Sequence, residues 1–287
     1  MVTNGAGTYS AGALFSLEGK TAVVTGASGF LGRTMVRALL DNGATVLLLG
    51  GSERVHAQAP LLKEQYGEER VHSYRADLYD LPAAGAVLAQ ITAEHPAVDI
   101  LINNAHELGS RTGFNVPEGH LEKATFDGWM RNLTAGVYWA ALTTQHFGQG
   151  MKARRQGSIV NISTMYAVVA PSPHLYEGTR FINPPGYGAS KAALLAFTRY
   201  TASFWGAYGV RANAILPGPF SNTEEATQNS VSAGDPFLER LNSRTVLGRV
   251  GSPRELVGAV LYLASDDAAF VTGTAHLVDG GFSITRT

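Results

Sequence analysis

Tyr187 and Lys191 are the residues whose types and spacing could most directly carry out chemistry. Residues four apart on a helix lie on one face, one turn from each other. A phenol titrates near about pH 10, too high for a good base at neutral pH, but a nearby ammonium favours the phenolate and lowers that pKa. Tyr187 could then take a proton from a substrate hydroxyl, or donate one in the reverse direction, with Lys191 as the supporting cation.

Two hydroxyl-bearing residues precede this pair in the chain. Ser163 and Thr164 follow the apolar run 158–162, which has the character of a buried strand. A hydroxyl at the end of such a strand could hydrogen-bond the reacting oxygen and support the negative charge that develops there. Each hydroxyl can both donate and accept, so the residue types alone leave the choice open.

Glycines follow the first apolar run of the chain and lead directly into a helical pattern. Gly26, Gly29 and Gly32 have the spacing that lets a chain turn tightly, approach a pyrophosphate and pack a helix on a strand. The N-terminus of that helix would offer N–H donors and a partial positive charge to phosphates. An ordinary strand-to-helix turn also fits, but the position after the first strand favours a dinucleotide site.

Short apolar runs alternate with longer helical patterns along the chain, and this order predicts the fold. The apolar runs cover residues 21–25, 45–49, 99–103, 158–162 and 210–216, and the helical patterns cover 30–42, 52–66, 81–94, 122–150, 186–208 and 253–265. The runs do not alternate apolar with polar residues, which indicates strands buried on both faces. We therefore predict an α/β fold with a single Rossmann-type, doubly wound parallel sheet and helices on both faces.

The composition excludes several classes of protein. Lys and Arg number 22 and Asp and Glu 23 in 287 residues, so a formal charge of −1 offers no electrostatic footprint for nucleic acid or an acidic membrane. Only 16% of residues are charged and 45% are hydrophobic, which excludes disorder. The chain has no cysteine, which excludes disulfides and Cys-ligated zinc, and no metal site is expected.

The two ends of the chain differ in character. Residues 1–14 carry no positive charge and no sustained apolar stretch, so we expect a flexible N-terminal tail rather than a secretory signal. Residues 15–287 contain no linker and no apolar run of the roughly 18 residues that a membrane span needs. We expect them to form one dinucleotide-binding and catalytic domain of a cytoplasmic protein.

Taken in order, the motifs resemble those of the short-chain dehydrogenases/reductases. The matching pieces are TGASGFLG at 25–32, Asp77-Leu78, Asn103-Asn104-Ala105, Asn161-Ile162-Ser163-Thr164, Tyr187-Gly188-Ala189-Ser190-Lys191, Pro217-Gly218 and Val278-Asp279-Gly280-Gly281. The resemblance covers the chain from about residue 15 to its C-terminus. It implies an NAD(P)-dependent oxidoreductase that transfers a hydride between a nicotinamide cofactor and a secondary alcohol or ketone.

The resemblance also implies a role for each motif. Asp77 would lie by the adenine, and the Asn-Asn-Ala segment would line the cofactor. Pro217-Gly218 would lie by the nicotinamide, and Lys191 would hold the nicotinamide ribose. The catalytic hydroxyl would belong to Thr164, with Ser163 as the alternative. The expected cofactor-binding residues are Gly26, Ser28, Gly29, Phe30, Leu31, Gly50, Gly51, Ser52, Asp77, Leu78, Asn104, Ala105, His106, Ile162, Tyr187, Lys191, Pro217, Gly218 and Phe220.

The end of the second predicted strand bears on the choice between NAD and NADP. An NAD site usually has Asp or Glu there, about 20 residues after the glycine turn, to accept the ribose hydroxyls. This chain has Gly50 instead, and Ser52 and Arg54 could hold a 2′-phosphate. Gly51, where NADP enzymes of the family often have Arg, and the nearby Glu53 count against this. NADP is the expected cofactor, and NAD is the alternative.

Two single residues depart from the family pattern. Gapless counting from Trp129, and back from Gln145, puts Gly136 where the family has an Asn that helps to hold a proton-relay water. Asn132 is close to this position but out of register. His106 replaces the Gly that follows Asn-Asn-Ala, and it is either a packed or solvated histidine or one that faces the nicotinamide.

A longer departure lies between Thr164 and Tyr187. This Pro-rich segment, residues 165–186, is longer than the family usually has there. It is either a solvated surface insertion or a lid that presents polar groups to a hydroxyl-rich, sugar-like substrate. The polar residues concerned are His174, Tyr176, Glu177, Arg180 and Asn183.

Two further classes of function stay open at this point. One is a non-redox dehydratase or epimerase on the same scaffold, and the other is a catalytically weakened, nucleotide-binding regulatory protein, which Gly136 and His106 make conceivable. The expected partner is a small-molecule alcohol or ketone. A homo-oligomer, tetramer or dimer, is expected through the helix over 189–208, with Phe197, Phe204 and Trp205, and the apolar helix over 255–264.

Overall fold

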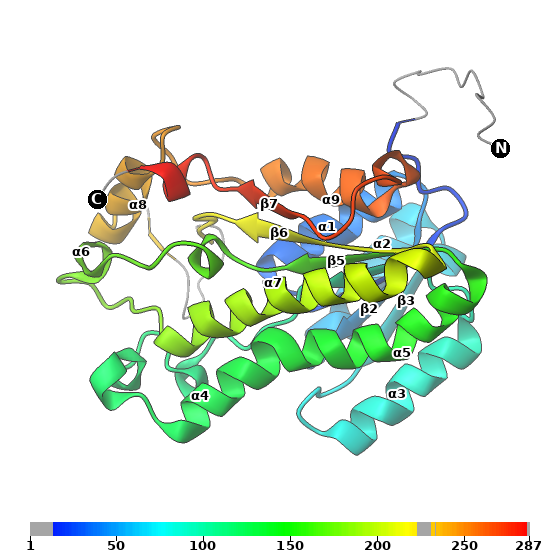
Figure 1. Cartoon of the computed structure of the whole chain (residues 1–287), viewed down its shortest axis with the longest axis horizontal. Coiled ribbons are helices and arrows are strands. Elements are labelled where there is room, and N and C mark those ends of the chain that lie inside the picture. Colours follow the sequence, from blue (N-terminus) through cyan, green and yellow to red (C-terminus); the bar gives the residue numbers. More distant parts are fainter. Residues whose placement is uncertain (1–13, 223–230, 233, 286–287) are drawn as a thin grey trace.

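The computed structural model describes residues 14–222, 231, 232 and 234–285, so residues 1–13 of the predicted tail lie outside the described residues. Strands and helices alternate along the chain (Figure 1). The strands are β1 Thr21–Thr25, β2 Thr45–Gly50, β3 Val71–Arg75, β4 Ile100–Asn103, β5 Gly157–Ile162, β6 Val210–Pro217 and β7 Ala275–Val278. The helices are α1 Phe30–Asp41, α2 Arg54–Tyr66, α3 Leu81–Glu94, α4 Phe126–Leu133, α5 Trp139–Arg154, α6 Pro173–Tyr176, α7 Pro185–Trp205, α8 Pro236–Arg244 and α9 Val257–Ala264.

The strands form one sheet in the order β3-β2-β1-β4-β5-β6-β7, and every pairing is parallel. The chain starts in the middle at β1, builds outward to β3, and then returns to place β4 on the other side of β1. The winding therefore reverses between β1 and β4, and folds of this kind bind ligands there, at the carboxyl ends of the strands. The predicted doubly wound α/β fold is confirmed.

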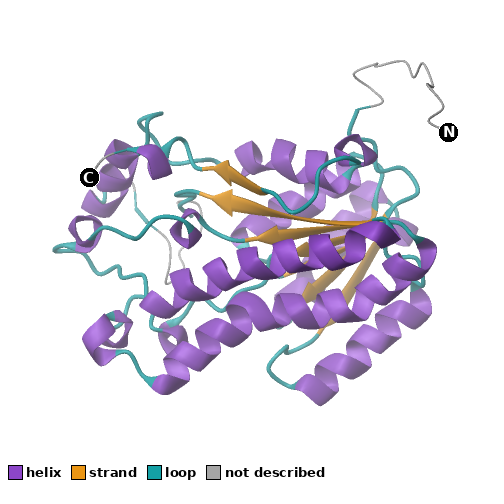
Figure 2. Cartoon of the chain, in the orientation of Figure 1, coloured by secondary structure: helices purple, strands orange, loops and turns teal. Residues whose placement is uncertain are grey.

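Helices cover both faces of the sheet (Figure 2). One apolar core lies between the sheet and α1, α2 and α9, and a second lies between the sheet and α3, α5 and α7. Val24 belongs to the first core and its neighbour Val23 to the second, because successive side chains of a strand point to opposite faces. This burial on both sides is why the strands read as unbroken apolar runs. No helix in the described part of the chain is both long and apolar enough to cross a membrane.

The apolar runs predict five of the seven strands, and the two that they miss are the edges, β3 and β7. An edge strand has a neighbour on one side only, so polar and half-exposed residues such as His72 and His276 are tolerated there. The sequence signal of a buried strand is therefore weakest where the sheet ends.

The prediction of a continuous helix over 122–150 is wrong in two respects. The helix begins only at Phe126, after a separate 3-10 turn, Leu121–Lys123. In the structure α4 and α5 are separated by a π-helical turn, Thr134–Tyr138, with Gly136 at its centre. A Cβ built on Gly136 would lie 2.1 Å from Ser190 Oγ of α7, so no larger residue fits. Such turns occur mostly as single interruptions of α-helices, frequently at functional sites.

A buried hydrogen-bond network joins the carboxyl ends of β4 and β5. Asn103 Nδ2 donates to Asn161 Oδ1 at 2.8 Å, and Asn103 Oδ1 accepts from Thr143 of α5 at 2.7 Å. Asn161 Nδ2 donates in turn to Thr198 of α7 at 2.9 Å. Buried polar groups need such partners, so the network fixes how both helices sit against the strand ends that precede the site.

The outer face of α7 only partly matches the predicted interface. Phe204 is 59% exposed and stacks on Tyr200, 57% exposed, with ring centroids 4.2 Å apart. Trp205, predicted for the same surface, packs instead on α5, where a Cβ built on Gly148 would lie 2.2 Å from its ring. Trp205 therefore belongs to the core of the subunit.

The other predicted interface helix, over 255–264, also packs largely in the core. It begins as a 3-10 turn, Pro253–Leu256, and continues as α9. Leu256, Val260 and Leu263 are buried against α1 and the sheet. Packing on the sheet thus accounts for most of the apolar character of this helix.

Candidate active site

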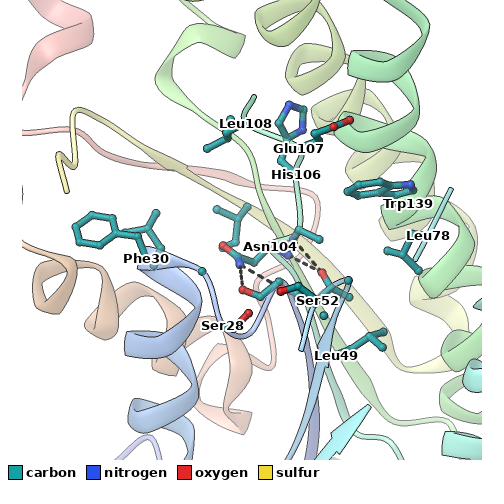
Figure 3. Close-up of a pocket in the computed structure, with 18 of the residues that line it drawn as sticks. Ser28, Phe30, Leu49, Ser52, Leu78, Asn104, His106, Glu107, Leu108 and Trp139 are labelled. Carbon is teal, nitrogen blue, oxygen red and sulfur yellow. Dashed lines mark hydrogen bonds between the residues drawn. The ribbon is translucent and has the colours of Figure 1, made fainter. Parts of the chain in front are cut away.

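A cavity of about 650 Å³ lies at the carboxyl ends of β1, β4, β5 and β6 (Figure 3). Every residue expected to bind the cofactor lines it, from Gly26 of the glycine turn to Phe220 after β6. The expected catalytic residues, Ser163 and Thr164 among them, line the same cavity. Motifs spread over most of the chain thus meet in one space whose size is typical of a ligand pocket.

Several lining residues were not singled out from the sequence. They are Leu49, Ala76, Glu107, Leu108, Arg111 and Trp139. The Glu107 carboxylate accepts a hydrogen bond from the Tyr79 hydroxyl at 2.6 Å. It also forms ion pairs of 2.8 Å with Arg111 and with Arg131. The sequence offered one indication that Glu107 lines the cavity, which is that it directly follows the Asn-Asn-Ala-His segment. No cluster of three or more His, Asp or Glu side chains that could hold a metal occurs within the described residues.

The glycine turn requires glycine at two positions for steric reasons. Gly26 has a φ of +64°, and a Cβ built on it would lie 2.9 Å from Ala105 Cα. A Cβ on Gly32 would lie 2.2 Å from the Gly26 carbonyl oxygen. Asn104 Nδ2 donates to the carbonyl oxygens of Thr25 and Gly26, each at 3.1 Å, which fastens the turn to the end of β4 (Figure 3).

The start of α1 fits the phosphates of a dinucleotide. Its N-cap is Gly29, and no side chain caps the first turn of the helix. The first backbone N–H groups of a helix have no partner within it, and the helix dipole adds a partial positive charge. Because the cavity runs along this end of α1, the glycine cradle and the bare helix start together match a pyrophosphate.

The residues at the end of β2 that line the cavity include no carboxylate. Gly50, Gly51, Ser52 and Arg54 line it. The Glu53 carboxylate, the one acidic group close in sequence, pairs with Arg75 instead. A negative group on a ligand would therefore meet a hydroxyl and a guanidinium here.

Lys191 is buried beside the strand end without an acidic partner. It is 3% exposed, its Nζ donates to the Ile162 carbonyl oxygen at 2.8 Å, and no ion pair involves it among the described residues. Burial lowers the pKa of Lys191 to about 7. The amine is thus poised between its charged and neutral forms near neutral pH.

The pKa of Tyr187 in the protein without a bound cofactor is higher than expected from the sequence. Burial raises its pKa to about 12, and a hydrogen bond with Thr164 acts in the opposite direction. The predicted lowering of this pKa by the Lys191 ammonium is not found: desolvation is the largest influence on the phenol, and Lys191 is not among the described groups that act on it. The phenolate therefore needs support that the protein groups alone do not supply.

The two candidate hydroxyls point to different partners. Ser163 Oγ donates to the Lys191 carbonyl oxygen at 2.9 Å, so it braces α7 against the end of β5. Thr164 lies beside the phenol of Tyr187 and accepts a hydrogen bond from the Tyr166 backbone N–H at 3.3 Å. The geometry therefore favours Thr164 over Ser163 as the hydroxyl that could contact a substrate oxygen together with Tyr187.

The two departures, His106 and Gly136, lie next to each other and next to Asn132. Asn132 is buried, and its Nδ2 donates to the carbonyl oxygens of Thr112 and Gly128, each at 2.8 Å. Gly136 offers no side chain. The His106 ring meets the Tyr187 ring edge-on, with centroids 5.0 Å apart, so His106 packs against the tyrosine, and it also lines the cavity.

The segment 165–186 is not a solvated surface insertion. It contains a 3-10 turn, Met165–Ala167, and α6, and it buries Leu175 and Phe181. Tyr176, Phe181 and Asn183 line a second cavity of about 220 Å³ next to Tyr187. The remaining wall includes Phe114, Tyr166, Phe220, Phe237 and Leu241. His174 and Glu177, by contrast, are 76% exposed.

Comparison with known proteins adds an independent observation. Residues 26–283 match the family model described as enoyl-(acyl carrier protein) reductase. The chain is 31% identical to sorbose reductase of Candida albicans, and the alignment covers 94% of this chain and 89% of that protein. It is 32% identical to galactitol 2-dehydrogenase (L-tagatose-forming) of Cereibacter sphaeroides, over 94% and 98% of the two chains. Gluconate 5-dehydrogenase of Burkholderia cenocepacia, solved with NADP and tartrate, superposes with a TM-score of 0.81 at 26% identity, over 96% of this chain and 100% of that one.

The buried Lys191 should make the stability of the protein depend on pH. Its pKa is about 7 in the folded state and 10.5 in an unperturbed chain. Between these values the unfolded state binds more protons, so the free energy of unfolding should rise with pH by up to about 1.4 kcal/mol per unit. Denaturant unfolding at about pH 7.5, 8.5 and 9.5 measures this rise, which Lys191→Met should flatten.

The matched control is Lys123→Met, at an exposed lysine with no ion pair among the described residues. It should keep the rise of the parent protein. An unchanged rise in Lys191→Met would show that another group is responsible.

Proposed function

This chain belongs to the short-chain dehydrogenases/reductases and is an NAD(P)-dependent oxidoreductase of a secondary alcohol or ketone, and on that premise we propose which of its residues do the chemistry. Tyr187 is the acid-base residue, Thr164 the partner hydroxyl and Lys191 the supporting amine. The observation that carries the proposal is their convergence: the three residues line one cavity, and Thr164 is hydrogen-bonded to the buried Tyr187 phenol.

The nicotinamide cofactor supplies the hydride acceptor or donor when it is bound. We assign its pyrophosphate to the glycine turn and the start of α1, and its adenosine ribose to the end of β2. The nicotinamide would lie towards Pro217 and Gly218, which line the same cavity beside Tyr187. In this arrangement the reacting carbon of a substrate would lie between the cofactor and the Tyr187 phenol.

The protein groups handle the proton. In the oxidative direction the substrate hydroxyl gives its proton to the Tyr187 oxygen as its carbon loses a hydride, and the carbonyl product leaves. In the reductive direction Tyr187 returns the proton to the developing alkoxide, whose charge the Thr164 hydroxyl supports. Burial lowers the pKa of Lys191 to about 7, so the amine is only partly charged at neutral pH, and only its charged form would support the phenolate.

We assign the substrate to the second cavity and propose that it is a small polyhydroxylated molecule. The cavity adjoins Tyr187 and is lined by aromatic rings and a few amides. The Asn183 side-chain oxygen is buried there and has no hydrogen-bond partner within the described residues, which suits a substrate hydroxyl. The names of the relatives point the same way, since they refer to a sugar and a sugar alcohol. Sorbose, galactitol and gluconate are the first compounds to screen.

The two alternative functions are not favoured. A sensor without chemistry has no evident need for a tyrosine, a lysine and a threonine hydroxyl held together. A non-redox reaction would retain the cofactor unchanged, whereas the relatives named above are a reductase and dehydrogenases. A cytoplasmic location remains a prediction from composition.

Replacing Tyr187 by Phe should abolish turnover, because the phenol proton is required only in the reaction. Removing a general acid-base group lowers kcat by about 10²- to 10⁴-fold, while NADPH binding and the melting temperature should change little. Steady-state assays, NADPH fluorescence titration and thermal melting measure the three effects. Tyr208→Phe, at an exposed tyrosine, is the control. Residual activity above about a tenth of the parent value would exclude Tyr187 as the acid-base residue.

Replacing Gly50 by Asp should shift cofactor preference from NADP towards NAD. A carboxylate there would repel a 2′-phosphate and accept the ribose hydroxyls, and a charge-assisted hydrogen bond corresponds to a change of about 10- to 100-fold in the ratio of kcat/KM values. A Cβ on Gly50 would lie 3.1 Å from Val55 Cβ, so Gly50→Ala serves as the control for crowding. A parent protein that already prefers NAD severalfold would contradict the assignment.

We also propose that the chain forms a homo-oligomer through the outer face of α7. Its stacked Tyr200 and Phe204 rings are exposed in the subunit. Phe204→Glu should therefore lower the mass measured by light scattering at micromolar concentration, whereas Phe126→Glu, at another exposed ring, should not. A monomeric parent protein would contradict this.

A further inference from the structure

The second cavity contains two phenols that the proposed reaction does not use. Tyr166 lies in the 3-10 turn directly after Thr164, Tyr176 lies at the end of α6, and both line this cavity. The Tyr176 hydroxyl donates to the Tyr166 hydroxyl at 3.2 Å. The pair therefore joins α6 of the long segment 165–186 to the turn that follows the candidate catalytic hydroxyl.

One hydrogen of this pair has no acceptor within the described residues. A tyrosine hydroxyl has a single proton to donate, and Tyr176 gives its proton to Tyr166. The Tyr166 hydroxyl accepts that bond and donates to no other group in the described part of the chain. The wall around it is largely aromatic and aliphatic, and a donor left unpaired in such surroundings is costly. An acceptor oxygen on a bound molecule would satisfy it.

Contacts with α8 hold the pair in place. The Tyr176 ring stacks on the Phe237 ring of α8, with centroids 5.7 Å apart. Arg240 of the same helix donates to the His174 carbonyl oxygen of α6 at 3.1 Å. Because α6 is fastened to α8 in this way, the hydroxyl that Tyr176 offers to Tyr166 is already in position before a ligand binds. Such preorganisation reduces the entropy lost on binding.

The pair lies close to the reacting groups. The Tyr166 backbone N–H donates to Thr164 Oγ1 at 3.3 Å, and Thr164 is hydrogen-bonded to the Tyr187 phenol. After burial and this hydrogen bond, the Tyr166 phenol is the remaining influence on the pKa of Tyr187. A substrate that reacts at Tyr187 would therefore have its other atoms next to the Tyr166 hydroxyl.

The two phenols are suited to recognition and not to proton transfer. Burial is the largest influence on each of them, and it raises the pKa of both Tyr166 and Tyr176 above the usual value for tyrosine. Both hydroxyls therefore keep their protons at neutral pH and act as hydrogen-bond donors.

We propose that Tyr166 is a specificity-determining residue whose hydroxyl donates a hydrogen bond to a second oxygen of the substrate, and that Tyr176 is the positioning residue that orients it. The preferred substrates are then diols or hydroxy ketones, and not alcohols with a single oxygen. This rests on the proposed assignment of the substrate to the second cavity. The pair depends on α6, so this recognition point comes with the segment that is longer than the family usually has.

Cyclohexanol and the three cyclohexanediols (1,2-, 1,3- and 1,4-) test the role of Tyr166, because each diol adds one hydroxyl to the same ring. Oxidation with NADP, followed through the formation of NADPH, gives kcat/KM for each compound. The parent protein should favour at least one diol over cyclohexanol by about 10- to 100-fold, as expected when the other compound leaves a donor unpaired. Tyr166→Phe should lose this preference, and thermal melting checks that the variant is folded.

Tyr176→Phe tests the positioning role. It keeps the Tyr166 donor but removes its partner, so it should reduce the preference for the diol by less than Tyr166→Phe does. The double variant should lose no more preference than Tyr166→Phe alone, because Tyr176 acts through Tyr166. A purely structural role would instead lower kcat/KM for cyclohexanol and for the diols by the same factor. Tyr208→Phe, at an exposed tyrosine, is the control and should keep the preference of the parent protein.

Two results would overturn the proposal. One is a parent protein that oxidises none of the four compounds or all four with equal kcat/KM, and the other is a Tyr166→Phe variant that keeps the parent preference. If Tyr187→Phe stays active, the proposed function itself fails. If Tyr187→Phe is inactive and Tyr166→Phe keeps the preference, only the recognition by Tyr166 fails.

Discussion

The site depends on the burial of one amine. A buried cation is costly unless it is paired, and within the described residues Lys191 has no acidic partner and donates to the Ile162 carbonyl oxygen, so its pKa falls to about 7. That contact requires α7 to run beside the end of β5, and Ser163 fastens the helix there through the Lys191 carbonyl. Tyr187, one turn earlier on the same helix face, is then held next to Thr164. The catalytic arrangement thus follows from how one helix lies against one strand.

The sheet brings everything else to that point. Its winding reverses between β1 and β4, which opens a space at the carboxyl ends of the strands. The glycine turn lies on one side of this space and Tyr187 on the other. The buried amides of Asn103 and Asn161 hold the ends of β4 and β5 together and anchor α5 and α7. The core of the protein therefore positions the glycine turn and Tyr187, while the segment 165–186 contributes part of the wall of the second cavity.

Much of this could be predicted from the sequence, for physical reasons. Gly26, Tyr187 and Lys191 carry requirements of backbone shape and chemistry that few other residues meet, so their types and spacing were informative. The π turn at Gly136 was not predictable, because the close approach of Ser190 at this turn joins segments that are distant in sequence. The raised pKa of Tyr187 and the burial of Phe181 also depend on packing between distant segments, which periodicity does not encode.

We propose that the cofactor cavity and the adjoining second cavity bring a nicotinamide and a hydroxylated carbon together for hydride transfer. NADPH carrying deuterium at the transferable C4 position, incubated with a ketone substrate such as sorbose, tests it directly. The account predicts that the deuterium appears on the new carbinol carbon of the product, one label for each NADPH oxidised. Product that forms without the label, while NADPH remains unchanged, would contradict hydride transfer and point to a non-redox reaction.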